Sequence, residues 1–396
     1  MWLLAFVLAV IGAGTPARPY ARTPVTPSID ILLSDSAHLI DGRRIGVITN
    51  AAAVDANRVM TLDRLIADGR ATVAAIFAPE HHFSASLRPG EEFHDSTDRR
   101  TGAPIYSLYD RNRAPTREQL AGLHALLVDL PDVGARPYTY VSTMVLAMRA
   151  AREAGVPVVV LDRPNPIGCL MAGPVLDPRN SSFIGMLPIP LRHGMTIGEL
   201  ARFANREQRI HADLRVIPLR GWRRCMWFDE TGLPFVAPSP NLPDLESVAW
   251  YPGTVLFEAT NMSAGRGTDA PFRQVGAPWF DPSLWSLFSA FEDTVTFTPR
   301  SPGDGKYDGV TLRGLRMVRS TRSGDPVDVA VRLMARLAHA FPDSFRVDTA
   351  GLRLRMGVGF DRGCPGVQCL PDASWNRWPR DIARFRAKAR RYFLYL

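Results

Sequence analysis

The sequence predicts an α/β fold, in which a Rossmann-like domain with a mostly parallel sheet precedes a smaller α/β or α+β domain. From about residue 29 onward, short β-branched runs alternate with helix-like segments, which is the pattern that βαβ units produce. A chain of 396 residues is long enough for two domains, and its 46% hydrophobic and 22% charged residues are ordinary globular values. We expect residues 28–260 to form the first domain and residues 261–396 the second.

Four strands are predicted in the first domain, with helices between them. The strand sequences are RRIGVIT, TVAAIF, ALLV and PVVVL, at residues 43–49, 72–77, 125–128 and 157–161. Helices are predicted at residues 61–68, at 142–154 with Gly155 as the stop, and after two capping boxes, Thr116 with Gln119 and Thr196 with Glu199.

The second domain is predicted to be less regular. It contains one clear strand in DGVTLRGLRM, a helix at residues 327–339 and a closing helix near residues 381–392. Residues 239–272, which join the two domains, are rich in Gly, Pro, Asn, Ser and Thr. This composition is typical of ordered loops that line a cleft.

The N-terminus, MWLLAFVLAVIGAG, begins with an apolar run that is too short to cross a bilayer and is followed by small residues and prolines. We interpret residues 1–27 as a signal peptide and linker, and therefore expect a secreted or periplasmic bacterial protein. A buried N-terminal helix is the alternative, because no Lys or Arg precedes the apolar run. No later segment predicts stable membrane insertion.

The four cysteines are Cys169, Cys225, Cys364 and Cys369. An even count in an exported protein permits disulfides, and Cys364 and Cys369 flank a short loop and are the favoured pair. Free structural thiols remain an alternative.

The net charge of +8 and the isoelectric point of about 9.7 favour contact with anionic polymers, including the bacterial cell wall. No basic tract is interleaved with aromatic residues, so nucleic acid is not an expected partner. The densest basic group is interpreted as the solvated face of the closing helix: Arg384, Arg386, Lys388, Arg390 and Arg391.

Polar residues follow every predicted strand of the first domain. In open α/β sheets the ligand crevice lies beyond the carboxyl ends of the strands, so these side chains are expected to meet at one edge. In chain order they are Asn50; Glu80, His81 and His82; Asp129, Asp132 and Arg136; and Asp162, Arg163 and Asn165.

Glycosidic bonds are cleaved by a carboxylic acid that protonates the leaving oxygen, with a second group acting on the other face of the sugar. Glu80 suits the acid role, since partial burial behind a strand raises a carboxyl pKa, and His81 can tune its charge. Candidates for the second carboxylate are Asp129, Asp132, Asp162 and Glu258. Glu199 is excluded, because its capping box already accounts for it.

Three arginines are candidates to bind a substrate carboxylate through two parallel hydrogen bonds: Arg136, Arg163 and Arg266. Each can equally form an ion pair within the protein. Arg266 is favoured because it lies between glycines that let a ligand approach the backbone. His193, just before a helix, is a further binding candidate, although a structural role suits it as well.

Other chemistries find little support. There is no P-loop and no G-x-S-x-G elbow, and the G-x-G in MGVGFDRG lies late in the chain, outside any strand–turn–helix unit. No cofactor is expected. A metal site built on His81, His82 and Asp95 remains an alternative, although adjacent histidines point in diverging directions.

Taken together, these motifs resemble a family long known as domain of unknown function 1343, whose characterised members are exo-β-N-acetylmuramidases of the NamZ type. The resemblance covers nearly the whole chain after the N-terminal segment. The matching motifs, in order, are GRRIGVITNAAAVD, FAPEHHF, TGAPIYSLYD, DVGARPYTYVSTM, VVVLDRPNPIG, IPLRHGMTIGELA, PSPNLP, YPGTVLFEATNMSAGRGTDAPF and FRAKARRYFLYL.

The resemblance implies an active site between the two domains and release of N-acetylmuramic acid from the non-reducing end of peptidoglycan fragments, disaccharides or muropeptides. The family's proposed catalytic glutamate falls on Glu80. The shared motifs add four substrate-binding candidates: Tyr140, Asn241, Asn261 and Thr268.

The sequence departs from the family pattern near the expected site. His82 stands where the family has glycine after Pro-Glu-His, and Ala259 and Cys169 replace further glycines. A second hypothesis is therefore a wall-binding protein that keeps the cleft and has lost turnover. A metal-dependent hydrolase is the third.

Overall fold

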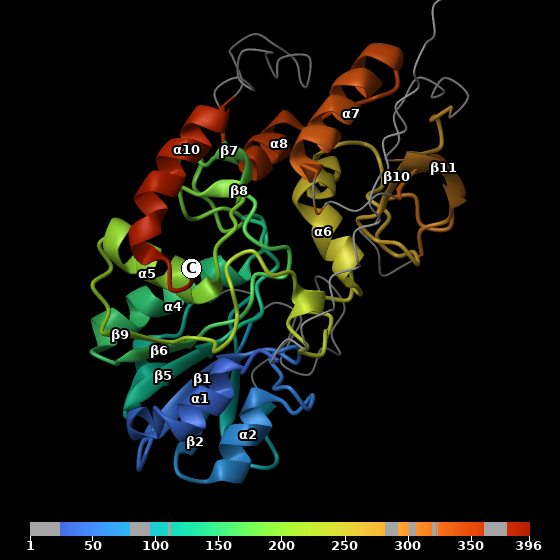
Figure 1. Cartoon of the computed structure of the whole chain (residues 1–396). Coiled ribbons are helices and arrows are strands. Elements are labelled where there is room, and N and C mark those ends of the chain that lie inside the picture. Colours follow the sequence, from blue (N-terminus) through green and yellow to red (C-terminus); the bar gives the residue numbers. More distant parts are fainter. Residues whose placement is uncertain are drawn as a thin grey trace, which may run out of the picture.

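A seven-stranded sheet organises the N-terminal part of the computed structural model (Figure 1), which describes residues 24–79, 96–109, 112–281, 292–300, 306–318, 322, 324–359 and 378–396. The strand order across the sheet is β3-β4-β2-β1-β5-β6-β9. The strands are β1 (Arg44–Thr49), β2 (Thr72–Ala78), β3 (Ser96–Thr97), β4 (Pro104–Ser107), β5 (Ala125–Asp129), β6 (Val158–Leu161) and β9 (Leu214–Ile217).

All neighbouring strands in this sheet pair in parallel except β3, which pairs antiparallel with β4 at the edge. Taken in chain order, the six parallel strands stand third, second, first, fourth, fifth and sixth across the sheet. That is the order of a Rossmann fold, so the predicted fold class is confirmed.

The four predicted strands are β1, β2, β5 and β6, whereas β4, β9 and the two-residue edge strand β3 were not predicted. The missed parallel strands, β4 and β9, have only four residues each. The sequence of β4 is PIYS, which starts with a proline and has one β-branched residue, and β9 is only partly buried. Their position in the sheet comes from pairing with β2 and β6 rather than from a local pattern.

Helices cover both faces of this sheet. α1 (Ser28–Ser34) and α2 (Thr61–Asp68) pack on one face, where Ile29, Leu62 and Leu65 meet Val47 and Leu127 in a buried cluster. The other face is covered by α3 (Arg117–Leu120), α4 (Tyr140–Ala154) and α5 (Ile197–Glu207). Successive strand residues alternate between the two clusters, as the pleat requires.

The local signals for helix ends are confirmed. Both capping boxes are present, at Thr116 with Gln119 and at Thr196 with Glu199. Gly155 ends α4 in the left-handed conformation, with φ of 71°, which glycine adopts without steric cost. The helix begins two residues earlier than residue 142, the predicted start.

The C-terminal part contains a three-stranded antiparallel sheet with the order β10-β12-β11. Its strands are β10 (Gln274–Ala277), β11 (Glu292–Phe297) and β12 (Leu312–Met317), and its helices are α6 (Leu245–Thr254), α7 (Pro326–Ala340) and α8 (Thr349–Met356). β12 and α7 confirm the predicted strand and helix. α6 packs against α7.

Shorter elements complete the described part of the chain. A two-stranded antiparallel pair consists of β7 (Ala172–Val175) and β8 (Pro190–Arg192). The 3-10 helices among the described residues are η1 (Ala37–Leu39), η2 (Pro178–Asn180), η3 (Phe228–Glu230), η4 (Val255–Ala259) and η7 (Arg390–Tyr392).

The last helix, α10 (Trp378–Ala389), returns to the N-terminal part and packs against β7 and near α5 (Figure 1). Edge-to-face ring pairs join Phe203 of α5 to Phe385 and Tyr392, with centroids 5.6 and 5.4 Å apart. The two sequence halves therefore share one continuous core rather than forming separate bodies.

A disulfide joins Cys169 and Cys225, which are 56 residues apart. The sequence did not single out this pair, because no spacing rule relates two loops that only the fold brings together. The favoured pair, Cys364 and Cys369, lies outside the described residues.

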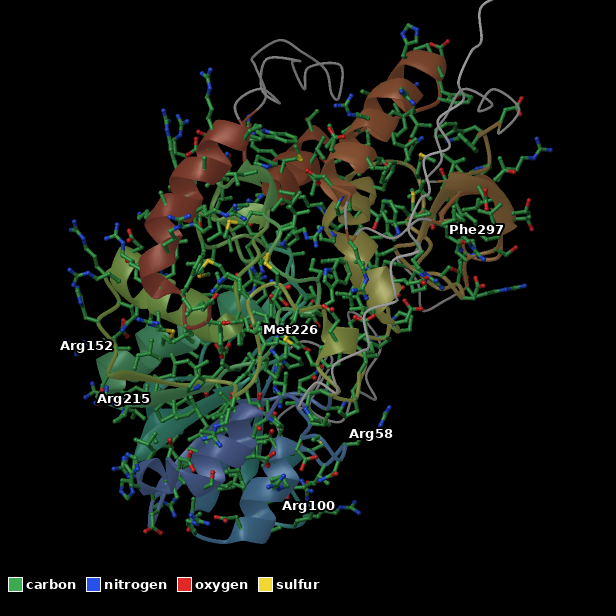
Figure 2. The ribbon with its side chains drawn as sticks, in the orientation of Figure 1. Arg58, Arg100, Arg152, Arg215, Met226 and Phe297 are labelled. Atoms are coloured by element: carbon green, nitrogen blue, oxygen red, sulfur yellow. A yellow bond between two sulfur atoms is a disulfide. The ribbon has the colours of Figure 1, made fainter. Side chains whose placement is uncertain are left out.

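The basic group that the sequence placed on the closing helix is exposed, at Arg384, Arg386, Lys388, Arg390 and Arg391. Arg58, Arg152 and Arg215 are all exposed, and they lie on separate segments (Figure 2). Within the described part of the chain, no helix is long and apolar enough to cross a membrane.

Candidate active site

A cleft of about 630 Å³ opens between the N-terminal and C-terminal parts. This volume falls within the range of about 300–1,000 Å³ that is usual for small-molecule sites. Its N-terminal side comes from the loop after β4, the start of α4, the turn after η2 and the segment that precedes α6. Its C-terminal side comes from α6, η4, the loop that follows η4, and α8. Residues from 239–272 line it, as the sequence predicted, but the range is not all loop, because it contains α6 and η4.

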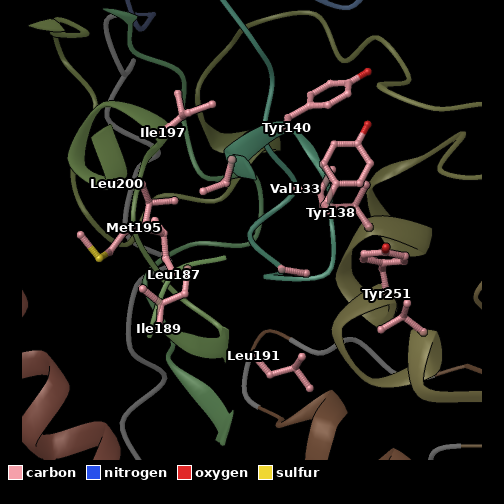
Figure 3. Close-up of a cluster of buried hydrophobic side chains, with 14 of the residues drawn as sticks. Val133, Tyr138, Tyr140, Leu187, Ile189, Leu191, Met195, Ile197, Leu200 and Tyr251 are labelled. Carbon is pink, nitrogen blue, oxygen red and sulfur yellow. The ribbon is translucent and has the colours of Figure 1, made fainter. Parts of the chain in front are cut away.

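Aromatic side chains form much of the cleft wall. Tyr138, Tyr251 and Phe272 all line it, and their rings form a chain of edge contacts with centroids 6.3 and 4.8 Å apart. Tyr138 and Tyr251 belong to the buried cluster that underlies the cleft, and their rings meet edge to face (Figure 3). Flat apolar faces with polar groups between them suit a sugar ring, which has apolar faces and a polar rim.

Asn50 and Tyr140 lie one layer beneath this wall. The Asn50 side-chain amide donates to the Tyr140 hydroxyl at 2.7 Å, and Tyr138 and Tyr140 both donate to the Pro238 carbonyl. Both predicted residues are buried and neither lines the cleft. Tyr138, whose ring centroid lies 4.6 Å from that of Tyr140, lines the cleft in their place, and it was not among the residues predicted from the sequence.

Glu258 and Arg266 both line the cleft, as predicted, and they form an ion pair at 2.7 Å. The second Glu258 oxygen pairs with Arg355 at 3.0 Å. Lys306 donates to the carbonyls of Glu258 and Thr260, which fixes the turn that carries this carboxylate. With both oxygens engaged by guanidinium groups, Glu258 is arranged to hold the cleft loops rather than to transfer protons.

Asn241 lines the cleft, whereas Asn261 and Thr268 do not. Asn261 accepts from the backbone N–H of Arg346 at 2.8 Å and so links its loop to the segment before α8. Thr268 accepts from the Gln274 side chain at 2.8 Å and shapes the loop that presents Arg266. These two predicted binding residues build the cleft loops from behind.

The strand-end carboxylates pair with other parts of the chain. Arg163 grips Asp129 with two hydrogen bonds, of 2.6 and 2.7 Å, and donates a third to the Val54 carbonyl. Neither residue lines the cleft. The sequence had left open whether Arg163 binds substrate or forms an internal ion pair, and the structure places it in the ion pair.

Asp132 and His193 form a second buried pair, with 3.1 Å between the His193 Nε2 and an Asp132 oxygen. That oxygen also accepts from the Gly134 backbone N–H, and the His193 Nδ1 accepts from Met195. Nε2 is therefore the ring nitrogen that faces Asp132. This pair lies away from the cleft.

Arg136 is buried and carries four hydrogen bonds to backbone carbonyls. Nη1 donates to Pro174 and Ile189 at 2.9 and 2.7 Å, and Nη2 donates to Arg355 and Met356 at 2.9 and 2.7 Å. Burial lowers the pKa of Arg136 to about 9. The side chain thus joins β7 and the β8 region to the C-terminal end of α8, and does not line the cleft.

Asn165 is buried as well. Its side chain donates to the Met195 carbonyl at 2.9 Å and accepts from the Ile167 backbone at 3.1 Å, which closes the turn after β6. Its role in this structure is to shape that turn, and it does not line the cleft.

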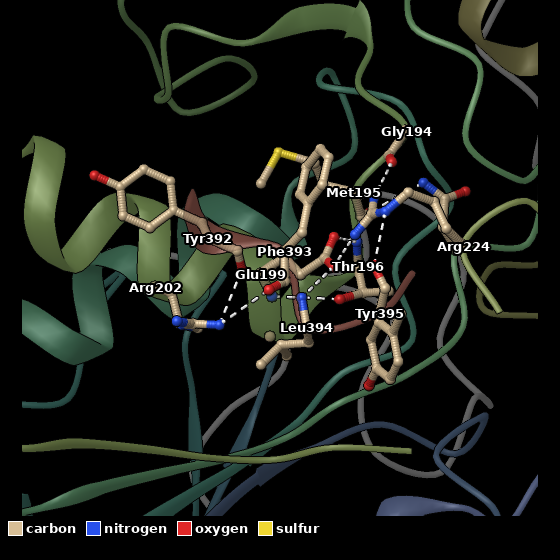
Figure 4. A network of polar contacts seen from close by, with 12 residues as sticks. Gly194, Met195, Thr196, Glu199, Arg202, Arg224, Tyr392, Phe393, Leu394 and Tyr395 are labelled. Atoms are coloured by element: carbon tan, nitrogen blue, oxygen red, sulfur yellow. Dashed lines mark hydrogen bonds and ion pairs between the residues drawn. The ribbon is translucent and has the colours of Figure 1, made fainter. Parts of the chain in front are cut away.

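Asp162 takes part in a buried network that involves the C-terminal segment. Its carboxylate accepts from the Tyr395 hydroxyl at 2.5 Å, from Thr196 at 2.8 Å, and from the backbone of Gly198 and Arg163. Next to it, Glu199 accepts from the Leu394 backbone and from Arg224 (Figure 4). Asp162 therefore anchors the N-terminus of α5 and lies apart from the cleft.

The network makes stability depend on pH. Burial raises the pKa of Asp162 from 3.8 to about 7, so the folded state binds this proton more tightly than the unfolded state. The stabilisation is complete below the unfolded pKa and is lost as pH rises to about 7. Relative to an Asp162→Asn variant, the parent's free energy of unfolding should fall by up to about 4 kcal/mol over that interval.

Urea unfolding of both proteins, from about pH 4 to about pH 8, measures this difference. An Asp213→Asn variant, which removes an exposed carboxylate, should follow the parent at every pH. The assignment would be contradicted if the parent's free energy of unfolding, measured relative to that of Asp162→Asn, stayed constant or increased as the pH rises.

Glu80 and His81 lie outside the described residues, but the chain that leads to them is described. The last residue of β2, Ala78, pairs with Ser107 of β4, and its carbonyl accepts from the Leu108 backbone at 2.8 Å. The next residue, Tyr109, lines the cleft. The described chain therefore reaches Pro79, directly before Glu80, beside this rim.

The metal alternative also rests on residues outside the described part, namely His81, His82 and Asp95. Among the described residues, no group of three or more His, Cys, Asp or Glu side chains is arranged to hold a metal ion.

Sequence reasoning missed several residues that line the cleft: Tyr109, Arg113, Tyr138, Phe183, Tyr251 and Phe272. Tyr109 follows β4, and Tyr138 lies in the loop after β5. A search for aromatic residues in the loops at the carboxyl ends of the strands would have found both. Phe183 comes from a turn with no repeating pattern, so nothing local marks it.

Family models match most of the chain. The model described as exo-beta-N-acetylmuramidase NamZ, N-terminal, matches residues 45–246, and the corresponding C-terminal model matches residues 249–395. The peptidoglycan beta-N-acetylmuramidase NamZ of Bacillus subtilis (strain 168) is 38% identical over 388 residues, covering 96% of this chain and 93% of that protein.

Two solved structures of DUF1343 family proteins from Bacteroides fragilis NCTC 9343 are also similar. One has a TM-score of 0.83 and 28% identity, and covers 96% of this chain and 100% of its own. The other has a TM-score of 0.76 and 30% identity, with 94% and 99% covered.

Proposed function

Because the chain belongs to the exo-β-N-acetylmuramidase NamZ family, it is a glycoside hydrolase of peptidoglycan, and we propose that Glu80 is its general acid. The substrate in this proposal is a peptidoglycan fragment with N-acetylmuramic acid at its non-reducing end, and the product is the free sugar. The observation that supports the assignment of Glu80 is that the carbonyl of Ala78, two residues before it, accepts from the backbone of Leu108, whose neighbour Tyr109 lines the cleft.

The other face of the sugar requires a second group. Of the aspartates that follow the strands, Asp129, Asp132 and Asp162 all lie in buried pairs away from the cleft. Glu258, the one described carboxylate in the cleft wall, is held between two arginines. This arrangement supports participation of the acetamido group of the substrate itself, a route that some glycosidase families use.

The experiment that tests this function is incubation of the purified protein with a disaccharide that has N-acetylmuramic acid at the non-reducing end, followed by chromatography of the products. We expect two monosaccharides in equal amounts, and the same yield with EDTA present. A disaccharide that binds by calorimetry and survives long incubation would instead support the wall-binding hypothesis. Loss of activity with EDTA would support the metal-dependent one.

We also propose that the protein works outside the cytoplasm. The apolar N-terminal run supports this location, and so does the Cys169–Cys225 disulfide, because cytoplasmic thiols are kept reduced. Fractionation of producing cells should recover the oxidised protein outside the inner membrane. Recovery in the cytoplasm with both thiols reduced would overturn the proposal.

A further inference from the structure

The charged side chains that line the cleft differ in whether they already form an ion pair. Its described charged side chains are Arg113, Glu258 and Arg266. Arg266 already donates to Glu258, so a substrate carboxylate placed on Arg266 would lie beside a second carboxylate and be repelled by it. Within the described part of the chain, Arg113 has no acidic partner, and it therefore offers a positive charge that a substrate anion can neutralise.

Arg113 is held in place by an aromatic ring. Its guanidinium carbon lies 4.3 Å from the centroid of the Phe183 ring, and both residues line the cleft. Stacking covers one face of the guanidinium and leaves its N–H edges available, which is the geometry that binds a carboxylate through two hydrogen bonds. Because the contact with Phe183 already restricts the Arg113 side chain, less conformational entropy is lost when a ligand binds to it.

Phe183 itself is presented by a tight turn. The backbones of Ser182 and Gly185 exchange two hydrogen bonds, of 3.0 and 3.1 Å, so that Phe183 and Ile184 stand at the tip. Arg113 comes from a different segment, the loop before α3. Two separate loops thus build this contact at the rim of the cleft.

The N-terminal end of α4 adds to the positive potential on this side. Tyr138 and Thr139, which precede the helix, line the cleft, and the first turn of the helix contains no acidic residue. The exposed N–H groups at a helix start favour nearby negative charge by about 0.3–1 kcal/mol.

We infer that Arg113, stacked on Phe183, binds the lactyl carboxylate of the terminal muramic acid and so gives the cleft its preference for an acidic sugar. The inference rests on the proposed function. It assigns to Arg113 the role that the sequence had favoured for Arg266, and it predicts that sugars without this carboxylate are poor substrates.

The test compares two chromogenic β-glycosides of N-acetylmuramic acid, one with the free lactyl carboxylate and one with the lactyl group as a carboxamide. The parent should prefer the carboxylate, and Arg113→Gln should lower kcat/KM for it by about 10- to 100-fold, mainly through KM. For the carboxamide, the variant and the parent should behave alike. Arg117→Gln, which removes an exposed arginine outside the cleft, should keep the preference of the parent.

Phe183→Leu supplies a second variant, which keeps an apolar side chain and removes the ring face. Its preference for the carboxylate should weaken less than that of Arg113→Gln. If Arg113→Gln still prefers the carboxylate, or if the parent does not distinguish the two glycosides, the inference is wrong.

Calorimetry separates this inference from the proposed function. Free N-acetylmuramic acid should bind the parent more tightly than its lactyl amide, and Arg113→Gln should lose that difference. This measurement applies even if the parent releases no product from either glycoside, a result that would refute the hydrolase proposal alone. Equal binding of acid and amide by the parent would refute the inference alone.

Discussion

Replacing Glu80 with glutamine should lower kcat by about 100- to 10,000-fold, the usual contribution of a positioned general acid, with little change in Tm. Glutamine has nearly the same shape as glutamate but has no acidic proton to give to the leaving oxygen. The measurement is the rate of release of N-acetylmuramic acid from the disaccharide. Glu118→Gln, an exposed change on α3, is the matched control and should leave the rate unchanged.

Substrates with different leaving groups can show whether Glu80 acts as a proton donor. A dinitrophenolate departs without a proton, whereas a sugar alkoxide needs one, so Glu80→Gln should slow cleavage of the disaccharide far more than cleavage of a dinitrophenyl glycoside. Equal losses on both substrates would assign Glu80 to substrate positioning. An unchanged rate on the disaccharide would remove it from the mechanism.

Replacing Arg136 with methionine should destabilise the fold by about 4 kcal/mol, because three buried carbonyl groups and one partly buried carbonyl group lose their donor at once, and a buried one costs about 1–3 kcal/mol when left unsatisfied. Methionine fills similar space, so the effect isolates the lost hydrogen bonds. Urea unfolding measures it. If the variant does not fold, Arg136→Lys, which keeps the charge and part of the bonding, should give an intermediate stability.

Arg179→Met is the control for the Arg136 experiment. Arg179 is exposed and pairs with Asp177 at the surface, where ion pairs contribute about 0–1 kcal/mol. Its stability should stay close to that of the parent. An Arg136→Met protein as stable as this control would mean that water or rearranged backbone can satisfy the carbonyls.

The regular elements could be predicted because their signals are local. The run TVAAIF, the capping box at Thr196 and the stop at Gly155 each lie within a few neighbouring residues, and all three are present in the structure. β4 has no such signal, because its place depends on pairing with β2.

The candidate site was less predictable, because a strand-end carboxylate has no visible partner in sequence. Asp162 looks like a catalytic aspartate until Tyr395, 233 residues later, is seen to donate to it. Asp129 likewise forms an ion pair with Arg163, which follows the next strand, β6. Convergence at one sheet edge brings such groups close enough to neutralise each other, and the groups that face the cleft come from the loops beyond them.

The bond between Tyr395 and Asp162 also constrains when this protein can fold. Ribosomes make the chain from its N-terminus, so the carboxylate after β6 and the start of α5 are synthesised long before the hydroxyl that completes them. Until residue 395 emerges, the Asp162 carboxylate can accept from Thr196, Gly198 and Arg163 but lacks the bond from the tyrosine. The polar network at the start of α5 is therefore expected to reach its final arrangement only after residue 395 has been synthesised, later than the strands and helices around it.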